Sequence, residues 1–514
     1  MEPRRGNSAE IVMADPVTTA PPVHPGTSDR ARAAALGPAA CGGARSEPAR
    51  AGGSLAGWFS LACVLLLIPG GAWALDKTEP MPEPASGAES WWAIGGQATV
   101  NTFFAPQFHS PYSNPAVSFG PGPDLGWSLV VSLLVGAHLW DGATVVADGE
   151  YANGAGAPNV SGVSGYPDGN MIRVAKVGTA PYVARVFFHQ DIALASATAP
   201  PEESEQFESR FMPTGSVSLG RPRPPTRLEF TVGKFGSNDF LDVADATSDP
   251  RHKFLNWALM QNGAWDYVAD TRGYTWGVEV GLETPRWGIR AMGALMPTTP
   301  NGSVFDGNLS NSGSYMLEGQ YGWTTAIGDG SAKVLGYVNR ANMGSYVSAL
   351  AAASAGPPGT VPNVDATAQA GAVKYGIGLL VQQVFGPVST FFRAGWNDGH
   401  TQTFCFTSID YTLSAGAQLD GGLWGRAGDF VGVGMAASGL SASHSAYLAA
   451  GGTEFQLGDG KLTYGWETVP EVYYSFQPVR YLDVSADVQT IFNPGMNRAR
   501  GPAFLAGVRL HAHL

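Results

Sequence analysis

The sequence has little charge and lacks long apolar runs. Only 14% of its 514 residues are charged, well below the ~25% of an ordinary soluble domain. A membrane-spanning helix needs about 20 consecutive apolar residues, and one stretch, Leu55–Leu75, approaches that length. The composition therefore excludes a polytopic helical membrane protein. The low charge also argues against the highly charged surface of an ordinary soluble domain.

Basic residues and cysteines are also scarce. The chain has 30 Lys and Arg against 42 Asp and Glu, a formal net charge of −12, and the basic residues form no cluster, which argues against a nucleic-acid partner. The three cysteines, Cys41, Cys63 and Cys405, include no C-x-x-C pair. Neither a zinc site nor a disulfide framework is predicted, and no cofactor is implied.

The N-terminal region has the pattern of an export signal. A short apolar core at residues 58–68 is followed by Pro-Gly-Gly and by small residues at Ala72 and Ala74, as signal peptidase requires. We predict an N-terminal extension plus signal peptide over residues 1–74, cleaved after Ala74, and a Pro/acidic periplasmic tether over 75–90. The alternative is an N-terminal membrane anchor, for which the apolar run is short.

From Trp91 onward, segments of roughly ten residues alternate between apolar and polar side chains. In the clearest segment, one face is polar, with Thr275, Glu279 and Glu283. The other face is apolar and comprises Tyr274, Trp276, Val278, Val280 and Leu282. Segments of this length, with aromatic residues near their ends, are typical of tilted membrane strands. We predict that residues 91–514 form an all-β, transmembrane antiparallel β-barrel of about 16 strands.

Short turn signals alternate with long irregular segments. Tight turns are predicted at residues 141–142, 285–286, 328–330, 386–387 and 478–480. The long segments are 153–180, 195–226, 236–264 and 349–370. Outer-membrane barrels have short periplasmic turns and long outer loops, and a barrel of 16 to 18 strands leaves an aqueous channel. We therefore expect a pore, with inward-folded loops that form a constriction.

One block makes a family resemblance visible. The stretch Asp249–Asp270, DPRHKFLNWALMQNGAWDYVAD, continues as TRGYTWG to Gly277 and resembles the carbohydrate-selective porin (OprB) family. Segments at 165–169, 184–190 and 492–511 agree in order. The resemblance implies passive diffusion of small sugars, glucose-like or short oligosaccharides, through a bacterial outer-membrane barrel.

The resemblance also implies partners, and the sequence departs from the family pattern in three places. Outer-membrane lipid would surround the barrel, and the barrel-assembly machinery would recognise its C-terminal strand. This chain ends in Leu514 where an aromatic residue is usual, and Gln261 and Asn170 stand where acidic residues are expected. The last two differences affect the expected charge of the pore.

Two charged residues on adjacent strands are candidates for the pore wall. Glu150 and Arg185 are expected to project into the lumen, with Val146, Val183 and Phe187 facing lipid. One interpretation is an acid/base pair across the constriction. The other is a structural salt bridge that attaches a loop to the wall, and the sequence leaves both open.

The remaining candidates lie in loops. Arg173 and Lys176 follow the turn-rich segment 165–169 and either line the pore or are solvated loop charges. In the family block, polar and aromatic residues interleave, so they could offer a sugar hydrogen bonds and stacking faces, or they could fill an inward-packed loop. The candidates there are Arg251, Asn256, Trp257, Asn262, Trp265, Asp266 and Arg272.

Other functions are compatible with parts of this pattern. A general, non-selective diffusion porin would have the same strand pattern. A barrel enzyme would need a positioned nucleophile, and neither G-x-S-x-G nor H-E-x-x-H occurs. A structural barrel would have a plugged lumen. His511 and His513 have the spacing of metal ligands, but alternation accounts for them as lumen-facing residues, and no metal site is predicted.

Overall fold

A computed structural model of the chain describes residues 91–156, 161–170, 180–194, 223–406 and 408–513. The predicted leader and tether, residues 1–90, lie outside this part of the chain, as do the candidates Arg173 and Lys176 and the terminal Leu514. Export and a pore-lining role for these two loop residues therefore stay predictions.

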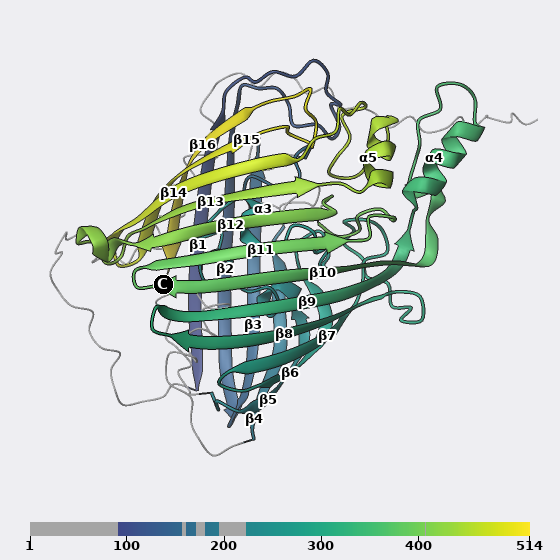
Figure 1. Cartoon of the computed structure of the whole chain (residues 1–514). Coiled ribbons are helices and arrows are strands. Elements are labelled where there is room, and N and C mark those ends of the chain that lie inside the picture. The colour runs from purple at the N-terminus through teal and green to yellow at the C-terminus, as the bar shows by residue number, and fades with distance from the viewer. Residues whose placement is uncertain (1–90, 157–160, 171–179, 195–222, 407, 514) are drawn as a thin grey trace, which may run out of the picture. The chain divides into compact units, whose positions relative to one another are not determined.

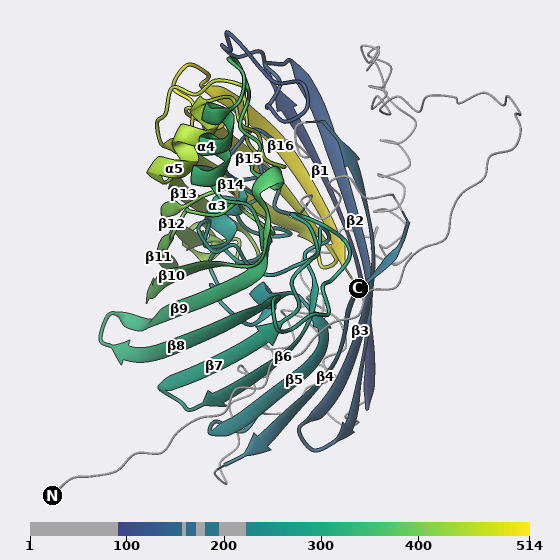
Figure 2. The same ribbon diagram turned by 90° about the vertical axis from the view of Figure 1, so that its right-hand side faces the viewer.

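Sixteen antiparallel strands close into one barrel, which confirms the predicted fold (Figures 1 and 2). Each strand pairs with its neighbours in sequence, and the first strand pairs with the last, from Gln97 opposite His513 to Phe104 opposite Ala506. Closure leaves no sheet edge unpaired, which a strand protein in lipid requires. The strands are β1 (Trp92–Ala105), β2 (Asp124–Trp140), β3 (Ala143–Ala155), β4 (Tyr182–Ala193), β5 (Arg227–Phe235), β6 (Thr275–Glu283), β7 (Trp287–Ala294), β8 (Gly313–Thr325), β9 (Gly328–Met343), β10 (Gln369–Phe385), β11 (Val388–Asn397), β12 (Tyr411–Asp420), β13 (Phe430–Gly439), β14 (Glu467–Val479), β15 (Leu482–Ile491) and β16 (Ala503–His513).

The wall has the predicted two-faced pattern. On β6, Trp276, Val278 and Val280 are exposed on the outer surface, whereas Glu279 and Glu283 are buried on the inner face. Successive side chains of a strand point to opposite faces, so the apolar face meets lipid and the polar face meets the interior. The prediction extended this alternation one residue too far, because Tyr274 precedes β6 and is buried inside.

The two ends of the barrel differ. Short turns join strands at one end, as at Asp141-Gly142, where Gly142 has a φ of +75°. A Cβ there would collide with the Asp191 carbonyl, so only glycine fits. The other end carries α4 (Tyr346–Ala355) and α5 (Ala442–Ala449), which contact each other (Figure 1). Among the described residues, no helix has the length and apolar character needed to cross a membrane.

One long segment is on the unexpected side. The sequence predicts a long outer loop at segment 195–226, but β4 ends and β5 begins at the end of the barrel that carries the short turns. Antiparallel order alone decides which end a connection occupies, and its length does not. The other three long segments connect strands at the opposite end, as predicted.

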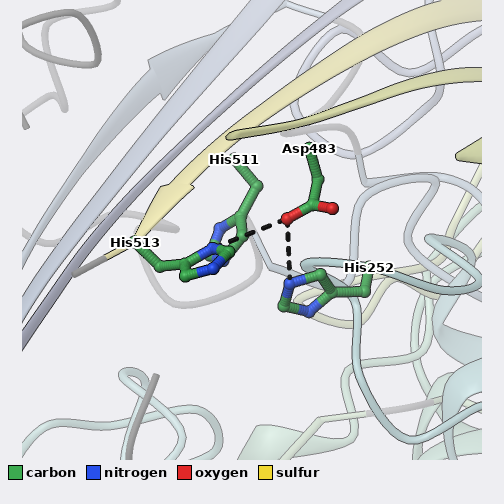
Figure 3. A group of neighbouring side chains, drawn as sticks. All are labelled: His252, Asp483, His511 and His513. Atoms are coloured by element: carbon green, nitrogen blue, oxygen red, sulfur yellow. Dashed lines mark ion pairs between the residues drawn. The ribbon is translucent and has the colours of Figure 1, made fainter. Parts of the chain in front are cut away.

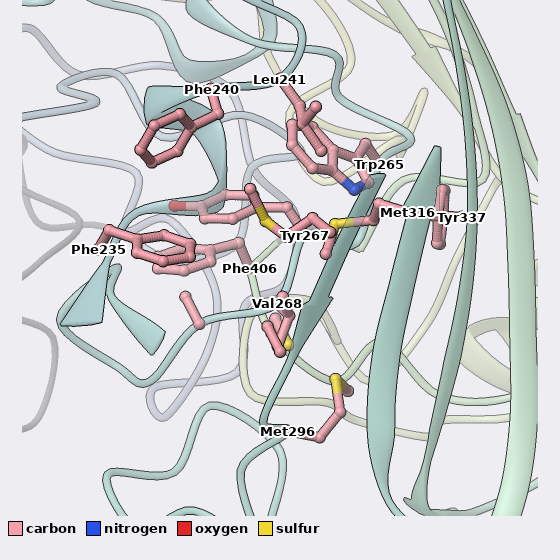
Figure 4. Close-up of a cluster of buried hydrophobic side chains, with 14 of the residues drawn as sticks. Phe235, Phe240, Leu241, Trp265, Tyr267, Val268, Met296, Met316, Tyr337 and Phe406 are labelled. Atoms are coloured by element: carbon pink, nitrogen blue, oxygen red, sulfur yellow. The ribbon is translucent and has the colours of Figure 1, made fainter. Parts of the chain in front are cut away.

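The connection between β5 and β6, residues 236–274, folds into the barrel, and we call it the inward loop. It contains η3 (Ser237–Asp239) and α3 (Trp257–Met260). Four of its aromatic residues, Phe240, Trp257, Trp265 and Tyr267, lie in a buried apolar cluster (Figure 4). The rings of Trp257, Tyr267 and Phe406 stack, with centroids 5.3 Å apart for Trp257 and Tyr267 and 4.5 Å for Tyr267 and Phe406. The loop therefore shares an apolar core with the inner face of the barrel wall. The remaining short helices are η4 (Asp365–Thr367) and η5 (Gly421–Trp424).

This loop core corrects the expected orientation of two wall residues. Val146 and Phe187 were expected to face lipid, but both are buried in the same cluster, on the inner face. Only Val183 of the three faces outward, 54% exposed. The register between β3 and β4 shifts between Asp148 and Gly149, which is how Val183 and Arg185 come to lie on opposite faces despite their even spacing.

Candidate functional site

The carboxylate of Glu150 lies where the barrel wall meets the inward loop. From the wall, Ser132 Oγ donates to Oε1 at 3.2 Å and the Tyr182 hydroxyl donates to Oε2 at 2.8 Å. From the loop side, Arg251 Nη2 donates to Oε1 at 3.1 Å and the Tyr274 hydroxyl donates to Oε2 at 2.7 Å. Each of the two oxygens of this buried carboxylate thus accepts one hydrogen bond from the wall and one from the loop side.

Two aromatic rings and a second arginine complete this group. The Arg272 guanidinium lies over the Tyr182 ring, 4.2 Å from its centroid, and the rings of Tyr182 and Tyr274 are 6.4 Å apart. We call Glu150, Tyr182, Arg251, Arg272 and Tyr274 the Glu150 cluster. Its partly exposed members, Tyr182, Arg251 and Arg272, offer two cationic donors and an aromatic ring, which are groups that can replace the hydration of a sugar.

Arg185 lies in a different junction. Its Nε and Nη2 donate to the two carboxylate oxygens of Asp239 at 2.8 and 2.7 Å, and its Nη1 donates to Asp148 at 2.7 Å. All three side chains are buried. Because Asp239 belongs to η3, the geometry favours the second of the two interpretations of Arg185, a salt bridge that holds a loop against the wall.

Most of the family block is buried. Asn256, Trp257, Asn262, Trp265 and Asp266 are each at most 2% exposed, so their direct contact with a sugar stays a prediction that the geometry does not favour. Arg251 and Arg272 are partly exposed, and both belong to the Glu150 cluster.

The buried polar residues of the block hold the loop in shape. Asn256 caps α3 by accepting from the Ala258 amide at 3.1 Å. Asp266 accepts the backbone N–H groups of Phe404 and Cys405 at 2.9 and 2.8 Å, which links the inward loop to the connection between β11 and β12. A carboxylate that accepts backbone N–H groups orders the segment that donates them.

Burial sets the acidity of several loop carboxyl groups. It raises the pKa of Asp168 although Ser128 and Asn101 donate hydrogen bonds to it. Burial likewise raises the pKa of Asp242 despite Arg393, and that of Asp266 despite Lys374. In each of these carboxyl groups, burial disfavours the charged form.

A cavity of about 250 Å³ opens at the short-turn end. Its lining includes the cationic side chains Arg223, Arg227, Arg286, Arg290 and Lys333. Acids partly balance them: Arg290 Nε donates to Glu229 at 2.8 Å, and its Nη2 lies 2.9 Å from Glu283. Trp287 and Tyr321 also line the cavity, so it combines charged groups with aromatic rings.

Sequence reasoning missed Tyr182, Tyr274 and this cavity. The sequence pattern predicts Tyr274 on the lipid face, as the first residue of the alternation that continues through β6. The register shift beside Tyr182 leaves no mark in the residue pattern. For the cavity a signal existed, since Glu229, Glu279 and Glu283 were readable as inner-face charges that require cationic partners.

Comparisons with known proteins agree with this architecture. A sequence model of the family described as "Carbohydrate-selective porin, OprB family" matches residues 131–514. A comparison with curated proteins finds no match. The high-pH structure of Pseudomonas putida OprB is similar, with 14% identity and a TM-score of 0.59 over 82% of this chain and 94% of that chain. The low-pH structure of the same protein has 12% identity and a TM-score of 0.41, over 82% of this chain and 92% of that chain. Pseudomonas aeruginosa OprD has 9% identity and a TM-score of 0.39, over 82% of this chain and 95% of that chain.

Proposed function

This chain belongs to the OprB family of carbohydrate-selective porins, and from that premise we propose that sugars pass the Glu150 cluster as they cross the barrel. It is a porin of the bacterial outer membrane, with carbohydrates as its substrates. The family is one of channels rather than enzymes. Diffusion through a porin needs no energy source, so sugars move down their gradient.

The position of Glu150 is the observation that carries this proposal. A sugar that passes between the wall and the inward loop meets the place where donors from both converge on one carboxylate. Its hydroxyl groups can exchange hydrogen bonds with the partly exposed Arg251, which the buried carboxylate of Glu150 holds in place, as water is removed. The ring of Tyr182, beneath Arg272, offers a flat face to the C–H groups of the sugar.

The proposal favours small uncharged sugars, glucose-like or short oligosaccharides. The carboxylate of Glu150 pairs with the guanidinium of Arg251, 3.1 Å away, so the charges cancel within this ion pair. Balanced charges supply donors and acceptors without a strong field along the path. A charged solute would disturb that balance, whereas a neutral sugar would not.

Three further elements belong to the proposal. A signal peptide ending at Ala74 directs export. The apolar outer surface, with residues such as Trp276 and Val280 exposed, contacts outer-membrane lipid. The C-terminal strand β16 engages the barrel-assembly machinery during insertion.

Planar-bilayer conductance of the protein purified from outer membranes tests the function. Glucose, maltose and a neutral non-sugar of similar size are added on one side. Selective block by the sugars supports the proposal, and equal block by the size control would identify a general diffusion porin.

The matched variants Arg272→Ala and Arg498→Ala test the site. Arg272 belongs to the Glu150 cluster, whereas Arg498 is an exposed arginine in the connection between β15 and β16. We expect sugar block to weaken several-fold in Arg272→Ala alone. Unchanged block in that variant would place the sugar path elsewhere.

A further inference from the structure

Three histidines and one aspartate converge on the inner wall at a place that the sugar path does not use. His252 comes from the inward loop, Asp483 from the start of β15, and His511 and His513 from the end of β16 (Figure 3). One ligand atom from each lies within 4.8 Å of all the others. Asp483 Oδ2 is 3.5 Å from both His252 Nε2 and His513 Nδ1. We call these four residues the histidine cluster.

Three atoms of the histidine cluster are buried and make no hydrogen bond among the described residues, although Asp483 Oδ2 lies at ion-pair distance from His252 and His513. They are His511 Nε2, His513 Nδ1 and Asp483 Oδ2. Buried polar atoms are nearly always satisfied in folded proteins, and those that are not require an explanation such as an absent ion. All three face the centre of the cluster, where one cation would serve them together.

The surrounding residues already orient two of the imidazoles. Asp249 Oδ2 lies 2.7 Å from His252 Nδ1, and the Thr99 hydroxyl lies 2.8 Å from His511 Nδ1. Each contact engages one ring nitrogen and leaves Nε2 directed at the cluster. A histidine that ligates a metal usually has its other nitrogen held in this way by a carboxylate, a carbonyl group or a water molecule.

We propose that the histidine cluster binds one Zn²⁺ ion. Three imidazole nitrogens and one carboxylate oxygen form a four-ligand set that zinc prefers, whereas Ca²⁺ and Mg²⁺ favour oxygen ligands alone. Tetrahedral zinc places its ligand atoms about 3.3 Å apart. The two 3.5 Å separations already match this geometry, and the remaining side chains need only close toward the centre.

The ion would tie the inward loop to the barrel wall. His252 is the one ligand from the loop, and it follows Arg251, which binds Glu150. Four protein ligands fill a tetrahedral site, so the site is structural and holds no open position for chemistry. Zinc binding would therefore fix the loop next to the Glu150 cluster. The metal site itself does not depend on the proposed sugar path.

Metal analysis of tag-free protein from outer membranes tests the proposal. After removal of loosely bound metal, we expect one Zn²⁺ per chain by mass spectrometry. We expect the affinity to fall at least tenfold in His511→Gln and in His513→Gln. The matched control is His400→Gln, because the His400 side chain is 71% exposed and lies outside the cluster; it should bind as the parent does.

Co²⁺ binding to the parent protein provides a second test, which does not require that a cluster variant folds. Co²⁺ added to the metal-free parent protein should give the visible absorption bands of a four-coordinate site, and Zn²⁺ should abolish them. Absence of these bands and of bound zinc in the folded parent would overturn the proposal. So would zinc binding that persists undiminished in folded His511→Gln and His513→Gln. Sugar block enters neither measurement, so these outcomes are separate from those that test the sugar path.

Discussion

Arg185 and Asp239 join the barrel wall to the inward loop through a two-pronged contact. Nε and Nη2 of the guanidinium donate to Oδ2 and Oδ1 of the carboxylate at 2.8 and 2.7 Å. The guanidinium also binds Asp148 on the neighbouring strand, so one buried cation serves two buried acids. This arrangement holds η3 at the place where the loop enters the barrel.

Replacing Arg185 with alanine should destabilise the barrel. The change leaves Asp148 and Asp239 buried without their cation, and removing one partner of a buried ion pair typically costs about 3–5 kcal/mol. The measurement is the temperature at which the compact form converts to the unfolded form on electrophoresis. Arg498→Ala is the control, because Arg498 is exposed and donates to a backbone carbonyl group, that of Tyr464. Parent-like stability of Arg185→Ala together with altered conductance would identify Arg185 as a pore charge instead.

Tyr182 should separate stacking from hydrogen bonding in sugar passage. Tyr182→Phe keeps the ring beneath Arg272 but removes the hydroxyl that donates to Glu150, whereas Tyr182→Ala removes both. We expect sugar block to weaken about tenfold in the alanine variant, or ~1.4 kcal/mol, and less in the phenylalanine variant. Titration of sugar block in planar bilayers measures both. Equal losses would mean that the ring contributes nothing.

The strand pattern was predictable because it is local. Each strand carries its own alternation, with lipid outside and polar groups inside, so β6 and β15 were readable residue by residue. Residues whose neighbours come from distant segments were not. Val146 is apolar on the inner face because the inward loop covers it. The residues near Val146 in the sequence do not indicate that this loop packs against it.

The candidate site shows the same division. Glu150 and Arg251 were both singled out, but their contact joins residues 101 positions apart. Alternation explained His511 and His513 as inner-face residues, which the structure bears out. It could not reveal that His252 of the inward loop lies against His511, with ring centroids 4.3 Å apart.

Cys405 should be unreactive in the folded protein. It is the free cysteine of the described residues and is fully buried. Burial, with the nearby Asp266 carboxylate, raises the pKa of its thiol, and the thiolate is the reactive form. A maleimide reagent should therefore label Cys405 only after denaturation, as mass spectrometry of the intact chain and its peptides would show. Rapid labelling of the folded barrel would mean that the inward loop opens readily.

His444, in α5, should stabilise the end of the barrel opposite the short turns, and this stabilisation should be lost at alkaline pH. It is buried between Asp410 and Glu454, at 3.0 and 3.1 Å, and although burial opposes its charge, these acids raise its pKa to about 9. Because the folded pKa exceeds the ordinary value near 6.5, this stabilisation is complete below pH 6.5 and is lost as pH rises through about 9, by roughly 3 kcal/mol. Other groups titrate in the same range, so the informative quantity is the difference in unfolding temperature between the parent and His444→Gln at pH 6, 7.5 and 9.5. That difference should shrink as pH rises, while His400→Gln should follow the parent throughout. A difference that does not vary with pH would show that His444 acts by packing against Tyr346 and not by its charge.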